Sequence, residues 1–331
     1  MPAPRGRGDV RPLAAVSLEQ IARVLLDEAS PQHLVEAALD RYSRICAEAT
    51  GVVPDAGFGA WEEDRFLDSG IAISPRAAAN CVTDYRRTLV FLRAVHAALT
   101  KLQATHDTGV VDVLYAGCGP WATLLLPLLD EFPPERLRVR LLDAHASALE
   151  SVRRLVELFG LEAHAISTEV ADASIYRCTV APQLIVAETM HKALEQEPQY
   201  AVTANLAPQL APDGIFVPER IDVDLCVSRD GARQRLGRLL SLSAQVHPVP
   251  EPVWLPVPSG LDVDAGQLEL VTSIRVFEDH WLLPGEAHIT LPRPCPGLLP
   301  LAAGARLRVE FRCGTFPVFE IGSEAPPAAA P

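Results

Sequence analysis

The sequence has no apolar run long enough to cross a membrane and no pair of cysteines spaced as CxxC. A membrane-spanning helix needs about 20 consecutive apolar residues, and the basic segment 1–12 lacks the apolar core of a signal peptide. The seven cysteines are odd in number and dispersed, which argues against metal and redox motifs and fits a reducing compartment. We therefore expect a cytoplasmic protein with no membrane contact and no metal site.

Positive charge is also scarce. The 29 Lys and Arg residues face 42 Asp and Glu residues, which gives a formal net charge of −13. So acidic a chain repels a nucleic-acid backbone and favours cationic or neutral partners. The 331 residues can bury a large core, and this length suggests two domains.

The first part of the chain, residues 1–105, shows helical spacing of apolar residues and no strand signal. Ser74 and Pro75 have the character of a helix start, and we expect one long helix from there to about Gln103.

From residue 106 the pattern changes to short apolar strands that alternate with helices, up to residue 219. One expected helix, residues 122–132, directly follows the first strand. Alternation of this kind predicts right-handed crossovers and a parallel, doubly wound sheet. Residues 220–323 are mostly strand candidates interrupted by one expected helix over 231–244, and residues 324–331 form a Pro/Ala-rich tail expected to be disordered.

The segment GCGPWA (117–122) separates the strand VDVLYA from the expected helix. Gly117 permits a tight turn, and Gly119 lets the backbone approach a ligand at a helix N-terminus. Asp143 ends the next strand, where an acid can accept hydrogen bonds from ribose hydroxyls. Asp172, after the third strand, suits an adenine amino group and favours S-adenosylmethionine. The cofactor-binding set that we expect also includes Cys118, Ala144 and Glu188.

Two carboxylates follow the fourth strand. Glu188 breaks the apolar run LIVA at the edge where ligands bind in open α/β sheets, and Glu197 comes nine residues later. Met190 and His191 lie in the loop between them, and we expect both to contact substrate. Two carboxylates held at one sheet edge can clamp a cation.

These segments resemble class I S-adenosylmethionine-dependent methyltransferases, specifically the protein arginine methyltransferase-like group. VDVLYAGCGP is similar to that family's cofactor strand and glycine loop. Glu188 and Glu197 match its double-glutamate pair at the family's spacing, with Met190 at the methionine between them. LAPDGIFVPER (210–220) resembles the segment that enters its C-terminal β-barrel.

The resemblance implies an α/β fold: a Rossmann-like sheet with an N-terminal helical region and a C-terminal β-rich, barrel-like domain. DYRRT (84–88) is similar to the family's D-x-x-R-T, which implies that Arg87 pairs with the carboxylate of the cofactor. DHW (279–281) is similar to its T-H-W loop, which implies that His280 pairs with Asp84 to accept a proton. By the same resemblance, the C-terminal domain could serve substrate binding or dimerisation, so that the protein could form a homodimer.

The chain also departs from the family's pattern. Thr189 and His191 stand where the family has tryptophan and glycine, and no tyrosine-bearing helix precedes Asp84. A lid over the pocket must therefore come from residues 55–80 or elsewhere. These differences point to a substrate other than a protein arginine.

The leading hypothesis is N-methylation of a guanidino or amino group in a cationic small molecule or peptide. Forked hydrogen bonds from Glu188 and Glu197 would localise the charge of a guanidinium on one side and free the opposite nitrogen. Alternatives are a small-molecule C- or O-methyltransferase with reassigned glutamates, a cofactor-binding partner protein without turnover, and an NAD-dependent oxidoreductase, because residues 117–122 nominally satisfy the dinucleotide fingerprint as well.

Overall fold

The computed structural model describes residues 11–57, 61–105, 109–229, 232–245, 250–258, 268–295 and 304–324. The tail expected to be disordered lies outside these residues except for its first residue. In the described part of the chain, no helix is long and apolar enough to cross a membrane.

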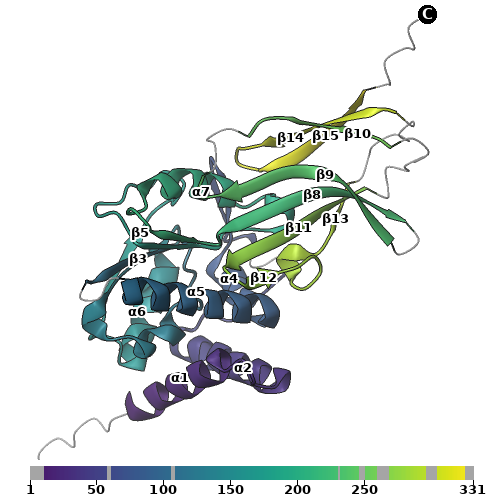
Figure 1. Cartoon of the computed structure of the whole chain (residues 1–331). Coiled ribbons are helices and arrows are strands. Elements are labelled where there is room, and N and C mark those ends of the chain that lie inside the picture. Colours follow the sequence, from purple (N-terminus) through teal and green to yellow (C-terminus); the bar gives the residue numbers. More distant parts are fainter. Residues whose placement is uncertain are drawn as a thin grey trace, which may run out of the picture.

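Two helices, α1 (Arg11–Leu26) and α2 (Gln32–Thr50), open the described chain. They pack on each other and on α6 (Ala146–Phe159), at the end of the molecule away from the C-terminal strands (Figure 1). The helix α2 ends at Gly51, whose φ of 77° is the left-handed conformation that glycine adopts without strain.

The expectation of an all-helical N-terminal region is wrong at one segment. Residues Arg65–Leu67 (β1) and Gly70–Ala72 (β2) form an antiparallel hairpin. Three-residue strands with no apolar alternation give no periodic signal, so their pairing depends on contacts made elsewhere in the fold.

The expected long helix from Ser74 is also interrupted. It is divided into α4 (Pro75–Asn80), a 3-10 turn (Cys81–Thr83) and α5 (Tyr85–Thr105). Asp84 has the non-helical ψ of 76°, and its carbonyl accepts the amide of Thr88 at 2.9 Å. Aspartate is a preferred residue at a helix start, and here it begins α5 rather than continuing α4.

The centre of the molecule is the expected parallel sheet, with strand order β5-β4-β3-β6-β7. Alternate residues of β3 face opposite sides: Val113 and Tyr115 join the core on one side, and Leu114 and Ala116 join the smaller core that includes residues of α7. The strands and the remaining helix are β3 (Val111–Ala116), β4 (Leu137–Asp143), β5 (Ala165–Val170), β6 (Leu184–Ala187), β7 (Ile215–Val217) and α7 (Gln199–Leu206).

No α-helix forms over residues 122–132. The segment after the glycine loop is a turn that leads into a 3-10 helix, Leu126–Glu131, and Ala122 has a φ of 42°. Pro127 lacks an amide proton, and its ring would clash with the carbonyl four residues earlier in an α-helix. The glycine loop therefore does not sit at the N-terminus of an α-helix, contrary to expectation.

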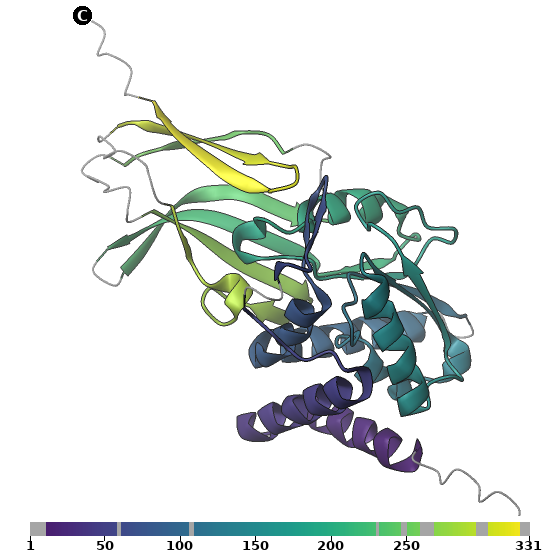
Figure 2. The same ribbon diagram turned by 180° about the vertical axis from the view of Figure 1, so that it is seen from behind.

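The chain turns antiparallel after β7. One sheet has the order β12-β11-β8-β9 with β13 added to β11, and a second has the order β10-β14-β15 (Figures 1 and 2). The β-rich C-terminal region expected from the sequence is thus present. Its strands are β8 (Arg220–Arg229), β9 (Ala232–Ser243), β10 (Val253–Pro256), β11 (Leu268–Phe277), β12 (His280–Leu282), β13 (Arg293–Pro294), β14 (Arg306–Arg312) and β15 (Val318–Glu324).

The helix expected over residues 231–244 is instead the strand β9, paired with β8 along its length. Two of its arginines form ion pairs with acidic residues of β8 and β11. Nη2 of Arg235 lies 3.0 Å from Oδ1 of Asp224, and Nε of Arg233 lies 3.2 Å from Oε2 of Glu269. Helical propensity is a weak preference that tertiary pairing overrides.

Candidate active site

The site is built where three parallel strands end together. Ala116 at the end of β3 pairs with Leu142 of β4 and with Ala187 of β6. The next residues, Gly117, Asp143 and Glu188, therefore leave the sheet at one edge, and all three line a pocket of about 1050 Å³ including its open mouth.

Glycine at position 117 is required by its surroundings. Its φ is 69°, and a Cβ placed there would lie 2.3 Å from Cγ2 of Thr189. The amides of Gly117 and Cys118 both donate to the carbonyl of Leu142, at 2.9 and 3.0 Å. The glycine loop is thus held against β4 on one side and against the loop after Glu188 on the other.

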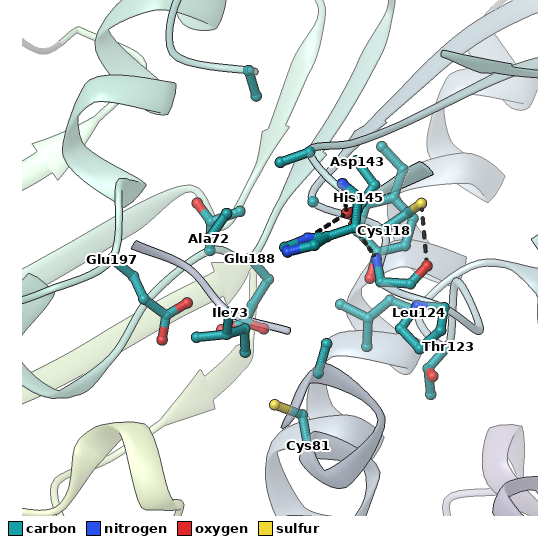
Figure 3. A pocket seen from close by; sticks show the side chains of 18 of the residues that line it. Ala72, Ile73, Cys81, Cys118, Thr123, Leu124, Asp143, His145, Glu188 and Glu197 are labelled. Carbon is teal, nitrogen blue, oxygen red and sulfur yellow. Dashed lines mark hydrogen bonds and ion pairs between the residues drawn. The ribbon is translucent and has the colours of Figure 1, made fainter. Parts of the chain in front are cut away.

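Asp143 is 8% exposed, and its carboxylate fastens the glycine loop. Oδ2 accepts the amide of Gly119 at 2.9 Å and Oδ1 accepts the amide of His145 at 2.8 Å. Oδ1 also lies 3.4 Å from Nδ1 of His145, so Oδ2 keeps the lone pair that can accept a ligand hydroxyl. The His145 ring lines the same pocket beside this carboxylate (Figure 3), a contribution that the sequence analysis missed although the histidine follows the strand-end acid by two residues.

Asp172 and Ala144 also line the pocket. Asp172 Oδ1 accepts the amide and the hydroxyl of Ser174 at 2.8 and 2.7 Å, which fixes the turn after β5. The carbonyl of Ala144 accepts a hydrogen bond from Arg65. Cys118 is buried and lines the pocket. The expected cofactor-binding residues of the three strand ends are therefore brought together.

Two buried polar atoms of pocket-lining side chains have no hydrogen-bond partner among the described residues. They are Nε1 of Trp121, a donor, and Oε1 of Glu188, an acceptor. Buried polar atoms are rarely left unpaired unless a ligand or water completes them. A ligand with acceptor and donor groups, such as a nucleoside cofactor next to a cationic acceptor, fits this pocket.

Glu188 forms an ion pair with Arg87, which reaches the pocket from the first turns of α5. The two side chains are only 6% and 12% exposed. Burial makes such a pair strongly interdependent, because removal of one partner leaves the other charge uncompensated.

Glu197 lines the pocket on the same side as Glu188, opposite Asp143 and Cys118 (Figure 3). Burial raises the pKa of Glu197 to about 7, with Arg87 lowering it and Asp64 raising it further. The neighbouring Glu195 faces away: Oε1 accepts the amide of Phe319 at 3.2 Å, and the same carboxylate pairs with Arg293. Of these two loop carboxylates, only Glu197 lines the pocket.

The loop between Glu188 and Glu197 is strained. Ala193, Leu194 and Gln196 have φ values of 55°, 61° and 68°, a conformation that costs non-glycine residues roughly 1–2 kcal/mol each. The strain is held by hydrogen bonds at 2.8 Å from the Gln196 amide to the Pro317 carbonyl and from the Ile71 amide to the Gln196 carbonyl. Such strain clusters at functional sites because the surrounding structure must maintain it.

A strap comprising residues 63–73 lies along the pocket and carries the hairpin β1–β2. Its Leu67, Ile71, Ala72 and Ile73 are pocket-lining residues. At one end the Glu63 carbonyl lies 3.3 Å from His145 Nε2. At the other, a Cβ on Gly70 would lie 2.6 Å from the backbone nitrogen of Pro198. The strap thus joins the Asp143 and Glu197 sides of the site, within the region from which a lid was expected.

Asp84 does not pair with His280. The Nδ1 atom of His280 lies 3.1 Å from the Phe277 carbonyl, and its ring lines a separate cavity that also contains Arg86. Asp84 Oδ2 instead accepts the amide of His288 at 2.7 Å. A three-letter match could not show that the second histidine, eight residues later, is the one at Asp84, because the tertiary fold decides this contact.

The two residues expected to contact substrate have different surroundings. Met190 is 2% exposed and packs in the hydrophobic core, and it does not line the pocket. His191 is half-buried, and its ring centroid lies 5.8 Å from that of His288. Burial and nearby positive charges, first of all His288, lower the pKa of His191 to about 4. Among the described residues, no cluster of His, Cys, Asp and Glu is placed to hold a metal ion.

No protein-family model matches the sequence, and no curated protein matches it. Solved structures do. The Trypanosoma brucei PRMT1 enzyme–prozyme heterotetrameric complex with AdoHcy matches with a TM-score of 0.54 at 14% identity, over 75% of this chain and 92% of that one. This chain has the fold of the protein arginine methyltransferases. The Arabidopsis thaliana protein arginine methyltransferase 10, in an open conformation, matches with a TM-score of 0.50 at 11% identity, over 70% and 85% of the two chains.

The arginine methyltransferase fold confirms the α/β sheet with helices before it and a β-rich region after it. At identities of 14% and 11% the likeness concerns the fold, and function has to be argued from the site.

Proposed function

We propose that the protein is an S-adenosylmethionine-dependent methyltransferase that methylates a guanidino or amino nitrogen of a small molecule or peptide. The observation that carries this proposal is the buried carboxylate of Glu188. It lies at the edge of the sheet, has one unpartnered oxygen, and shares the pocket with Glu197.

The cofactor would lie along the strand ends. Gly117 and Gly119 leave space for it, Asp143 and Asp172 offer acceptors for hydroxyl and amino groups, and Arg87 offers a cation for its carboxylate. When bound, S-adenosylmethionine supplies a methyl group on a positively charged sulfur. The AdoHcy in the trypanosome structure supports this choice over NAD.

The acceptor would be held by the two glutamates. Carboxylates bind a guanidinium by forked, charge-assisted hydrogen bonds. Glu188 and Glu197 would draw positive charge toward the bonded nitrogens and leave the far nitrogen with more electron density. Because both carboxylates project from one loop held in a strained conformation, they would also orient that nitrogen, and orientation supplies much of the rate of a two-substrate reaction.

Methylation of a nitrogen that carries hydrogen releases a proton. We assign its acceptance to His288, supported by the hydrogen bond that places this residue at Asp84. Burial and the positive charges of Lys192 and Arg87 lower the pKa of His288, so that the imidazole is neutral and able to accept a proton near pH 7. Asp84 would orient His288 and offset the charge that it gains.

The test is methyl transfer from labelled S-adenosylmethionine to a panel of guanidino and amino compounds and arginine peptides. Replacement Glu188→Gln should lower kcat/KM by about 100-fold or more, the scale for a group that stabilises developing charge. Glu195→Gln is the matched control, since that carboxylate faces Arg293, and it should retain activity within a few-fold. Activity that survives substitution of both Glu188 and Glu197 by glutamine would instead indicate C- or O-methylation.

We also propose that the chain forms a homodimer. The heterotetrameric assembly of the trypanosome structure supports self-association within this fold. Light scattering should give a mass of twice 35.8 kDa, and a monomer at assay concentrations would contradict it.

A further inference from the structure

A chain of contacts connects Glu188 with a group of polar residues outside the pocket and returns to the loop between Glu188 and Glu197. Glu188 pairs with Arg87, the Arg87 amide lies 3.5 Å from Asp84 Oδ1, and Asp84 Oδ2 accepts the His288 amide at 2.7 Å. The His288 ring meets the His191 ring at 5.8 Å, and His191 is three residues from Glu188 in the chain. The two histidines do not line the pocket itself, but they adjoin the Arg87–Glu188 pair through Asp84 and through the loop that follows Glu188.

Two of the three cationic side chains near this chain of contacts are paired with glutamates, and the Asp84 carboxylate accepts only the backbone amides of Arg87 and His288. Arg87 is paired with Glu188, and Arg293 is paired with Glu195. Lys192, which directly follows His191, has neither an ion pair nor a hydrogen-bond partner for its ammonium group in the described part of the chain. An ammonium group without a carboxylate partner, together with an imidazole N–H donor, can bind an anion through charge-assisted hydrogen bonds.

The electrostatic surroundings of the histidines agree with an anion site. After burial, the causes that lower the pKa of His191 are all positive charges: His288, Lys192, Arg87 and Arg293. Lys192 and Arg87 also lower the pKa of His288, whereas the carboxylate of Asp84 raises it. Positive potential that disfavours protonation of an imidazole attracts an anion to the same place.

We infer that the methyl acceptor is a zwitterion: a guanidino or amino nitrogen held by Glu188 and Glu197, and an anionic group, such as a carboxylate, held by Lys192 and His191. This inference rests on the proposed function and names its substrate class. It favours a free guanidino acid or amino acid over a peptide, because an arginine within a peptide has its own carboxylate tied up in an amide bond.

The test compares acceptors that differ only in the carboxylate. Two matched pairs are 4-guanidinobutyrate with propylguanidine and free arginine with agmatine. The acid of each pair should be methylated with a kcat/KM about tenfold or more above its partner, the scale of one added ion pair in a partly buried site. Equal rates for both members would overturn the inference and leave the proposed function standing. Methylation of no guanidino or amino compound would overturn both.

The sequence offers a matched control because it contains two lysines, Lys101 and Lys192. Lys101 pairs with Glu278 at 2.7 Å, is exposed and does not line the pocket. Lys192→Met should reduce the preference for the acid toward unity, mainly through KM, whereas Lys101→Met should keep it. A preference that persists in Lys192→Met would contradict the assignment.

A second readout does not depend on turnover. Acetic anhydride should modify both lysines, and mass spectrometry distinguishes them. With S-adenosylhomocysteine present, 4-guanidinobutyrate should protect Lys192 and leave Lys101 unchanged, and propylguanidine should protect neither. Equal protection of Lys192 by both compounds would show that the ammonium does not recognise the carboxylate and would overturn the inference.

Discussion

Arg87 and Glu188 form an ion pair inside the pocket although 101 residues separate them in the sequence. The guanidinium of Arg87 thus occupies one arm of the clamp that we assign to the acceptor. A carboxylate on the cofactor would offer Arg87 an alternative partner and free Glu188. In the proposed function, cofactor and acceptor binding would therefore be coupled through one arginine, and such coupling is reciprocal.

The first prediction concerns this arginine. Arg87→Gln should weaken the binding of S-adenosylhomocysteine by about tenfold or more, because a buried charge-assisted contact is lost. Calorimetric titration measures this directly. The neighbouring Arg86 is the control, since it is exposed and lies 3.5 Å from Glu286. Arg86→Gln should bind as the natural chain does. Equal losses in the two variants would show that the effect is not specific to the pocket.

The second prediction is a pH dependence set by Glu197, whose pKa is raised to about 7 by burial. Below that pH the carboxyl group is neutral and grips a cation poorly, so that kcat/KM should rise with pH through about 7 and then level off. Glu197→Gln should remove this step and lower the plateau. Glu150→Gln, on the exposed face of α6, should keep the step.

The raised pKa of Glu197 should also affect stability. Activity should rise with pH, whereas the contribution of Glu197 to stability should fall. Folded Glu197 holds its proton up to about pH 7, above its ordinary value of 4.5, so that its stabilising contribution is complete below pH 4.5 and is lost as the pH rises through 7. The natural chain should therefore gain less stability from pH 5 to pH 8 than Glu197→Gln does. A profile identical in the two proteins would mean that Glu197 titrates normally.

The third prediction tests the strap. Gly70 has a φ of 150°, and a Cβ there would lie 2.6–2.9 Å from backbone atoms of Glu197 and Pro198. Gly70→Ala should displace the strap or the glutamate loop and cost about 1–3 kcal/mol, measured by denaturant unfolding. Gly314 is the matched control: its φ is 146°, and no atom lies within 4 Å of the added Cβ. A similar cost in Gly314→Ala would attribute the effect to backbone strain alone.

Much of the sheet and the strand-end residues could be predicted from the sequence, because both follow local rules. Buried parallel strands are continuous apolar runs, and their carboxyl ends share one edge. Gly117, Asp143 and Glu188 are therefore recognisable as neighbours from the strand pattern itself. Glu197 could be predicted only through its spacing from Glu188, because local pattern did not distinguish it from Glu195.

The remaining features depend on contacts between distant segments. The leucines of β9 have helical spacing, which predicts a helix. The ion pairs between the arginines of β9 and the acidic residues of β8 and β11 form only in the folded sheet. His288 rather than His280 reaches Asp84 because of the course of the chain after β12. The strap is held mainly by backbone contacts at Glu63, Gly70 and Ile71, which a side-chain pattern does not encode.

The proposed function requires above all that the pocket at the ends of β3, β4 and β6 bind S-adenosylmethionine. Calorimetric titration of the protein with S-adenosylhomocysteine and, separately, with NAD measures this requirement. We expect saturable one-site binding of S-adenosylhomocysteine, abolished by substitution of Gly117 with a bulky residue, and no heat from NAD. Binding of NAD without any response to S-adenosylhomocysteine would contradict the methyltransferase assignment.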